Sequence, residues 1–249
     1  MQTVICMKWG TLYGPEYANR LHAMVRRNTR RPLRFVCFTE DATGLHPGIK
    51  VQPLPPIRIP AHHQRFPWRK MSLWGETLGD LIGQVLFLDL DLVVTGDVDG
   101  FFDHAPEQDF VVIRNWTSRA PVSGERAIGN TSCFRLRVGS NAHLLAAVEA
   151  DFDGIFAAHR IEQAFISRHV QSIAFWPEGW CVSFKHSLLP PWPARLWRPA
   201  ALAPGTRLVA FTGKPDVHDV LDGRWPAPWY KKFYKSLRRP DWVAEHWRE

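Results

Sequence analysis

Hydrophobic residues along the chain form short runs and spaced positions that predict alternating strands and helices. Thr3–Met7 and Leu33–Thr39 are mostly apolar runs, the pattern of buried strands. Between them, apolar residues at helical spacing predict a helix over Glu16–Asn28. A strand, a loop, a helix and a second strand within about forty residues indicate a βαβ unit, and therefore an α/β fold.

The most apolar segment, Gln84–Val94, contains two acidic residues, Asp89 and Asp91. This run predicts one central strand buried on both faces, preceded by a helix over Arg69–Leu81. The same patterns predict further strands at Phe110–Arg114, Ser132–Leu136, Ser172–Phe175 and Leu208–Phe211, and further helices at Asn141–Ala150 and Arg160–His169.

Composition restricts the class of protein. With 249 residues, 45% hydrophobic and 22% charged, the chain can bury a substantial core and is not of a disordered type. No apolar run approaches the roughly 20 residues of a membrane span. The segment Met1–Cys6 lacks the basic start of a secretory signal, so we expect a cytoplasmic protein. The four cysteines form no CxxC pair and are expected to be buried thiols.

Charge and aromatic residues are concentrated at the C-terminus. Lys and Arg total 31 against 24 acidic residues, a net charge of +7, and the chain contains 12 Trp. Many of these bases and aromatics lie in residues 224–249, so we expect a domain of residues 1–223 and a basic aromatic tail of residues 224–249. Such a tail is typical of proteins that bind peripherally to an anionic membrane, and we expect contact with the inner membrane face. A C-terminal helix packed on the domain is the other interpretation. Nucleic acid is not an expected partner, because no nucleic-acid-binding motif accompanies the bases.

Asp89 and Asp91 are the sharpest chemical feature of the sequence. Carboxylates within an apolar run are costly unless they are paired or bind a metal. Because side chains two residues apart leave a strand on the same side, this pair predicts a clamp for a hard cation such as Mn²⁺ or Mg²⁺. A dehalogenase-type phosphatase also uses an Asp-x-Asp strand end, but it needs a later Lys followed by a Gly-Asp pair, and no Gly-Asp pair follows Lys185 or Lys214 here.

The run Val85–Asp91 with the following Gly96-Asp97-Val98 and Phe101-Phe102 resembles the DxD region of GT-A-fold glycosyltransferases, and is most similar to glycosyltransferase family 8 and its bacterial relatives. In this interpretation Asp97 and Asp99 are turn and capping groups rather than metal ligands. Further short segments resemble elements of the family in the same order: Trp68–Met71, Gly129–Ser132, Glu162-Gln163, Trp180–His186 and Phe211–Pro215.

The resemblance implies a GT-A fold, a Rossmann-like mixed sheet flanked by helices, and assigns roles to individual residues. Gln163 and Glu162 would face the transferring sugar, and Asp89 and Asp91 would bind the metal. The family's third ligand, a histidine, matches Ala210 or Thr212 here, so His218 becomes the candidate for that position. The residues expected to bind the donor are Lys8, Trp9, Gly10, Tyr13, Arg69, Lys70, Leu90, Asn130, Gly213 and Lys214.

The implied activity is transfer of a hexose from a nucleoside-diphosphate sugar, with UDP favoured, to a hydroxyl of a glycan or glycolipid acceptor. The resemblance also implies a divalent metal and retention of the anomeric configuration. Neutralising the charge that develops on the leaving diphosphate is chemistry that such an ion supplies. The alternative is a noncatalytic scaffold that binds a nucleotide sugar or a membrane, because the family's metal histidine is missing.

Overall fold

The computed structural model describes residues 1–117 and 126–249, which divide into two compact units. The chain passes between the two units several times, and one of these crossings lies between Leu90 and Asp91. The expected boundary at residue 223 stays a prediction. The first unit comprises Met1–Ala18, Arg30–Leu90 and Asp99–Trp176, and the second comprises Asn19–Thr29, Asp91–Val98 and Pro177–Glu249.

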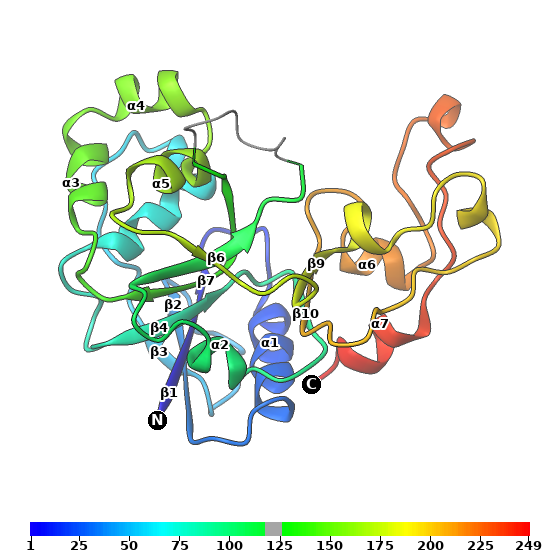
Figure 1. Ribbon diagram of the computed structural model, residues 1–249, viewed down its shortest axis with the longest axis horizontal. Coiled ribbons are helices and arrows are strands. Elements are labelled where there is room, and N and C mark those ends of the chain that lie inside the picture. The colour runs from blue at the N-terminus through cyan, green and yellow to red at the C-terminus, as the bar shows by residue number, and fades with distance from the viewer. Residues whose placement is uncertain (118–125) are drawn as a thin grey trace. The chain divides into compact units, whose positions relative to one another are not determined.

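The first unit is built on a seven-stranded mixed sheet in the order β3-β2-β1-β4-β7-β6-β8 (Figure 1). The neighbours from β3 to β4 are parallel, β7 is antiparallel to both β4 and β6, and β8 is parallel to β6. Placing β4 beside β1 creates a topological crossover, the kind of position where open α/β sheets bind ligands. The strands are β1 (Gln2–Lys8), β2 (Leu33–Thr39), β3 (Lys50–Gln52), β4 (Gln84–Leu88), β6 (Phe110–Arg114), β7 (Gly129–Arg137) and β8 (Ala174–Phe175).

Aromatic side chains form much of the core of the first unit. The rings of Trp74 and Phe134 stack with centroids 5.9 Å apart, and Phe87 stacks on Phe134 at 4.8 Å. These rings come from a 3-10 helix, Pro67–Trp74, and from β7 and β4, so the core joins the helical layer to the sheet. The other helices of this unit are α2 (Gly100–Asp103), α3 (His143–Ala150), α4 (Phe152–His159), α5 (Glu162–His169) and a 3-10 turn at His63–Arg65.

The second unit contains a three-stranded sheet and short helices. Its sheet has the order β5-β10-β9, with β10 antiparallel to β5 and parallel to β9. Most of α1 belongs to this unit, and Arg27 donates hydrogen bonds to the carbonyls of His246 and Arg248. None of the described helices has the length and apolarity needed to cross a bilayer. The elements are α1 (Pro15–Arg27), β5 (Leu92–Val94), β9 (Cys181–Ser183), β10 (Leu208–Ala210), α6 (Val217–Leu221) and α7 (Asp241–His246), with a π-helical turn at Phe184–Leu188 and 3-10 turns at Ala194–Leu196 and Trp229–Lys231.

Strands and helices with strong local patterns are close to their predicted positions, including β1, α1, β2 and β6. The single strand predicted over Gln84–Val94 is wrong. The chain leaves β4 after Leu88, turns at Leu90 and Asp91, and re-enters extended structure as β5, which pairs in a different sheet. Apolar content signals burial but not the sheet to which a segment belongs, so both halves read as one strand.

The helix predicted over Arg69–Leu81 is also wrong. The 3-10 helix Pro67–Trp74 occupies the first part of this range, and a turn occupies the rest. Gly75 ends the 3-10 helix with extended backbone angles, and Gly79 has φ +57°, a left-handed conformation that glycine adopts without steric cost. The helix predicted over Arg160–His169 begins later, at Glu162, because Arg160 has φ +55° and Ile161 is extended.

Candidate active site

A buried lysine, Lys70, lies among polar groups from three elements of the first unit. Its Nζ is 3.2 Å from Oδ2 of Asp89 and 3.8 Å from Oε1 of Glu162, and it donates to the carbonyl oxygen of Thr131 at 3.2 Å. The Lys70 side chain is only 8% exposed. A buried ammonium needs such partners, because desolvating an unpaired charge is strongly unfavourable.

Glu162 is held from a second direction. The Thr131 hydroxyl on β7 donates to Glu162 Oε1 at 2.8 Å, while Glu162 itself begins α5. The Glu162 carboxylate is buried, and two groups hold it in place: the hydroxyl of Thr131 and the ammonium of Lys70. A single positive charge thereby faces two carboxylates, Asp89 and Glu162. We name these four residues, Lys70, Asp89, Thr131 and Glu162, the Lys70 cluster.

Asp89 stands directly after β4, where its backbone N–H donates to the carbonyl oxygen of Ser132 at 2.9 Å. Burial raises the pKa of Asp89, whereas attraction to Lys70 and the hydrogen bond from Lys70 oppose that rise. The negative charge of Glu162 adds to the increase. The ionised form of Asp89 therefore depends on the cation beside it.

A pocket of about 640 Å³ lies in the same unit, after the ends of β1 and β2. Gly10 is part of its wall, with φ +60° and its N–H donating to Glu40 Oε1 at 2.8 Å. Four of the residues predicted to bind the donor meet at this pocket. The lining consists of Trp9, Gly10, Thr11, Leu12, Tyr13, Glu40, Leu54, Ala61, Gln64, Arg65 and Arg69.

Arg69 gives the pocket a buried cation. Its side chain is 7% exposed, and Nη2 donates to the carbonyl oxygen of Pro55 at 2.7 Å. Its Nη1 is buried without a hydrogen-bond partner among the described residues. Burial lowers the pKa of Arg69, and Glu40 opposes that change. Because Lys70 is the next residue, one turn of the 3-10 helix supplies a cation to the pocket and a cation to the cluster.

Other predicted residues of the first unit have local partners. Lys8 is buried and its Nζ donates to the carbonyl oxygen of Asp41 at 3.3 Å. Asn130 Oδ1 accepts from the Ser132 N–H at 3.1 Å, and Leu90 is buried. Gln163, beside Glu162, is half-buried, and its carbonyl oxygen accepts from the Ser167 hydroxyl at 2.6 Å. These contacts fix the backbone around the cluster and the pocket.

The second unit holds the remaining predicted residues. Lys214 is exposed and its Nζ lies 3.0 Å from Asp219 and also pairs with Asp216, which chiefly raises the pKa of Lys214. Gly213 before it has φ +70°. His218 is an exposed residue of α6, with its ring centroid 6.5 Å from that of Trp247. Asp91 lies in the turn between β4 and β5 and is half-buried.

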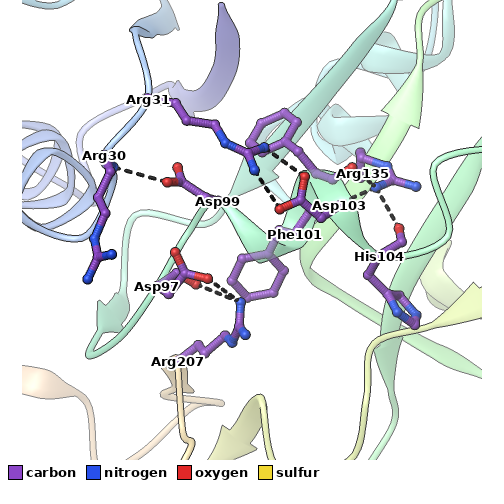
Figure 2. A network of polar contacts seen from close by, with 10 residues as sticks. Arg30, Arg31, Asp97, Asp99, Phe101, Asp103, His104, Arg135 and Arg207 are labelled. Carbon is purple, nitrogen blue, oxygen red and sulfur yellow. Dashed lines mark hydrogen bonds and ion pairs between the residues drawn. The ribbon is translucent and has the colours of Figure 1, made fainter.

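Three acids that follow β5, Asp97, Asp99 and Asp103, form hydrogen bonds or ion pairs within their own units (Figure 2). Asp99 accepts from the backbone N–H of Arg30 at 3.1 Å, and Asp103 is paired with the guanidinium of Arg31 at 2.7 Å. Asp97 is paired with Arg207 at 2.7 Å. Asp99 stands at the N-cap of α2 but its side chain makes no capping hydrogen bond there, so the interpretation of Asp97 and Asp99 as turn and capping groups stays a prediction.

Among the polar residues of these sites that sequence reasoning missed are Thr131, Glu40 and Arg65. Glu40 directly follows the strand ending at Thr39, and residues after the carboxyl ends of parallel strands commonly face ligands, so its position was a usable signal. Thr131 lies next to Asn130 in a segment already singled out. For Arg65 the sequence offers no signal, because only the folded loop brings it to the pocket wall.

A metal ion could be held only by side chains that lie close enough together to coordinate it. Within residues 1–117 and 126–249, no three His, Cys, Asp or Glu side chains are grouped to enclose an ion. Mg²⁺ commonly takes only one or two protein carboxylates and completes its shell with water and substrate phosphates. Carboxylate oxygens such as those of Asp89 and Asp91 are donors that a hard ion prefers, so each of these residues is chemically suited to hold one.

Comparison with solved structures identifies the class of fold. The galactosyltransferase LgtC, solved in complex with donor and acceptor sugar analogs, matches with a TM-score of 0.62 and 10% identity over 93% of this chain and 99% of that one. Mouse xyloside xylosyltransferase 1, in its apo form, matches with a TM-score of 0.53 and 10% identity over 84% and 96%. The glycosyltransferase GlyE of Streptococcus pneumoniae TIGR4 gives 0.59 and 11% over 99% and 61%. No family model and no curated protein matches the sequence.

The chain therefore has the GT-A fold of these glycosyltransferases, and the predicted fold class is confirmed. The structural likeness covers 93% of this chain for LgtC and 99% for GlyE, at 10% and 11% sequence identity.

Proposed function

We propose that the protein is a glycosyltransferase that moves a hexose from a nucleotide sugar, with UDP as the expected carrier, to a hydroxyl of a glycan or glycolipid. The observation that carries the proposal is the buried Lys70 cluster immediately after β4 of a GT-A fold. Two fixed carboxylates around one cation form a preorganised polar site. Burying these charges costs desolvation free energy, and groups buried in this way are concentrated at functional sites.

The pocket beside β1 and β2 supports a nucleotide as its ligand. Trp9 and Tyr13 offer aromatic surface for a flat base, and the unpartnered Nη1 of Arg69 offers a charged donor to an oxygen. In this proposal Lys8, Gly10, Leu90 and Asn130 shape the backbone around the donor, and Gly213 and Lys214 contact its diphosphate.

In the proposed reaction, protein groups orient the sugar and hold charge. Lys70 holds the carboxylates of Asp89 and Glu162 in place, and Glu162 with Gln163 faces the sugar that is transferred. Asp89 and Asp91 would hold Mn²⁺ or Mg²⁺, with His218 as the candidate third ligand. When bound, that ion would neutralise the charge developing on the leaving diphosphate. Retention at the anomeric carbon is part of the proposal and is read from the anomer of the product.

Turnover of a panel of UDP-sugars with Mn²⁺, with hydrolysis as the readout when no acceptor is known, tests the proposal. We expect Asp89→Asn to lower the rate at least about 100-fold, since it removes a charge made to act on the reacting groups. The matched control is Asp109→Asn, a half-buried acid that is paired with Arg137 away from the Lys70 cluster, and this variant should retain the full rate. Equal rates for both variants would contradict the mechanism. Tight UDP binding without turnover would indicate a noncatalytic binding protein.

We further propose peripheral contact with an anionic membrane, through a surface of the second unit. Residues 229–234 carry Trp229, Tyr230 and Phe233, which are 83%, 59% and 70% exposed. The loop at 192–197 adds Trp192 and two further exposed residues, Leu196 and Trp197. We name these six residues the aromatic face.

The two segments of the aromatic face are joined. Trp192 Nε1 donates to the carbonyl oxygen of Phe233 at 3.2 Å, and their ring centroids are 4.9 Å apart. Arg238 donates to the carbonyl oxygen of Leu196 at 2.7 Å. Exposed aromatics beside bases such as Lys232 are typical of proteins that rest on anionic headgroups. This contact would place the enzyme near a lipid-linked acceptor.

A further inference from the structure

A pair of histidines in the first unit lies apart from the Lys70 cluster and the pocket. His159 ends α4 and His169 ends α5, and their Nε2 atoms are 3.3 Å apart. The two rings are nearly perpendicular, with an interplanar angle of 87° and centroids 5.2 Å apart. No motif in the sequence indicates this pair, because the two residues are ten positions apart and the turn between α4 and α5 brings them together.

The distances distinguish a hydrogen bond from a shared ion. A straight N–H···N bond, the favoured geometry, would at this nitrogen separation place the centroids about 5.6 Å apart. The observed 5.2 Å is shorter, so the axes through the two nitrogens are inclined to each other. Two imidazoles on one tetrahedral ion, with bonds of about 2.0–2.1 Å, would have nitrogens about 3.3 Å and centroids about 5.2 Å apart. Both observed distances match that arrangement.

Both rings are held in place by the surrounding packing. Phe165, which is buried, contacts His159 with centroids at 5.5 Å and His169 at 4.8 Å. The Nδ1 of His159 is buried, which leaves its Nε2 as the nitrogen able to meet a ligand. The carbonyl oxygen of His169 lies 3.0 Å from Nε2 of His143. A fixed pair loses little rotamer freedom on binding an ion, so its geometry is preorganised.

The charge state also suits an ion. Burial lowers the pKa of His159, and the neighbouring His169 and Arg168 lower it further. A neutral imidazole has the free lone pair that a metal ligand needs.

We propose that His159 and His169 form a surface site for a borderline transition-metal ion, Zn²⁺ or Cu²⁺, with water completing the coordination. Imidazole nitrogens prefer these ions to Mg²⁺ or Mn²⁺, so the site is chemically distinct from the carboxylates Asp89 and Asp91. An ion here would tie the end of α4 to the end of α5, across the turn at Arg160 that leads into Glu162. The inference does not depend on the proposed glycosyl transfer.

Titration of the full chain with Zn²⁺ by calorimetry, and with Cu²⁺ by electron paramagnetic resonance, tests the site. We expect one ion per chain and a Cu²⁺ spectrum with two coordinated nitrogens. His169→Gln, at an exposed position, should weaken binding at least about tenfold, since it removes one of two protein ligands. His159→Gln should do the same.

The matched control is His46→Gln, an exposed histidine of the first unit whose Nδ1 accepts the N–H of Gly48 at 2.9 Å. It should bind both ions as the unchanged protein does. Binding that is equal in the unchanged protein and in the double variant His159→Gln/His169→Gln would overturn the proposal, whether that binding is absent or strong. A loss of the two-nitrogen spectrum in His46→Gln would overturn it as well.

Discussion

At the residue scale, the candidate site depends on one buried cation. Lys70 lies within 4 Å of two carboxylates, and within residues 1–117 and 126–249 neither acid forms an ion pair with another base. Loss of the Lys70 ammonium would leave Asp89 and Glu162 without a counter-charge, and water inside the protein could not fully replace it. The backbone carbonyl and hydroxyl of Thr131 complete the polar contacts around the ammonium.

Replacing the cation should therefore destabilise the protein. We expect Lys70→Met to lower the free energy of unfolding by about 3–5 kcal/mol at neutral pH, the cost of leaving a buried charge unpaired. The deficit should shrink as the pH falls, because Asp89, whose pKa is already raised by burial, takes up a proton and no longer needs the cation. Urea unfolding at several pH values measures this.

Two further variants sharpen that measurement. Lys50→Met, at an exposed position, serves as the control and should change stability little. Lys70→Met/Glu162→Gln should recover part of the loss, because one of the two stranded charges is gone. A deficit independent of pH would show that lost packing, not charge, is responsible.

At the element scale, short helix α2 is fixed by an arginine from the strand behind it. Arg135 on β7 is fully buried, and its guanidinium donates to carbonyl oxygens of Phe101 at 2.7 Å and His104 at 2.8 Å (Figure 2). Further acceptors are the carbonyls of Phe102, Ala105 and Gln108. The last carbonyls of a helix lack intrahelical partners, and here one planar cation satisfies several of them.

Removing this cation should therefore destabilise the end of α2. We expect Arg135→Met to reduce the free energy of unfolding by about 3 kcal/mol or more, because several buried carbonyl groups lose their donor. The matched control lies two residues along the same strand: Arg137→Met removes a surface ion pair with Asp109 and should cost at most about 1 kcal/mol. Thermal and urea unfolding of both variants give the comparison, and similar losses would contradict this role for Arg135.

At the scale of the whole molecule, the excess of positive charge has a preferred location. The chain carries a net charge of +7, and seven of its Lys and Arg residues lie in residues 224–249 with only three acids. The same segment supplies half of the aromatic face. Val243 and Trp247, also in this segment, are buried, so substitution of exposed residues is a cleaner test of membrane contact than truncation.

The substitution experiment uses sedimentation with lipid vesicles. We expect the variant Trp229→Ser/Phe233→Ser to bind vesicles containing phosphatidylglycerol at least about tenfold more weakly, because two exposed aromatic groups no longer enter the interface. Vesicles of phosphatidylcholine alone should bind the unchanged protein weakly. Ile82→Ser removes an equally exposed apolar group from the first unit and should have no effect. Unaltered binding by the double variant would rule out the aromatic face.

The sequence by itself determined the elements whose signal is local. The apolar runs of β1 and β2 and the helical spacing of α1 predicted an α/β fold, and the order of short motifs around Asp89 predicted its GT-A class. Periodicity records which side of an element is buried, and this requires only neighbouring residues.

Only the tertiary structure decided which distant residues meet. The division of Gln84–Val94 into β4 and β5 follows from pairing with β10, more than a hundred residues later. The meeting of Lys70 with Glu162, and of His159 with His169, likewise depends on how helices pack and turn. The physical reason is that a contact between distant residues is fixed by the packing of the whole core, whereas a local pattern records burial alone.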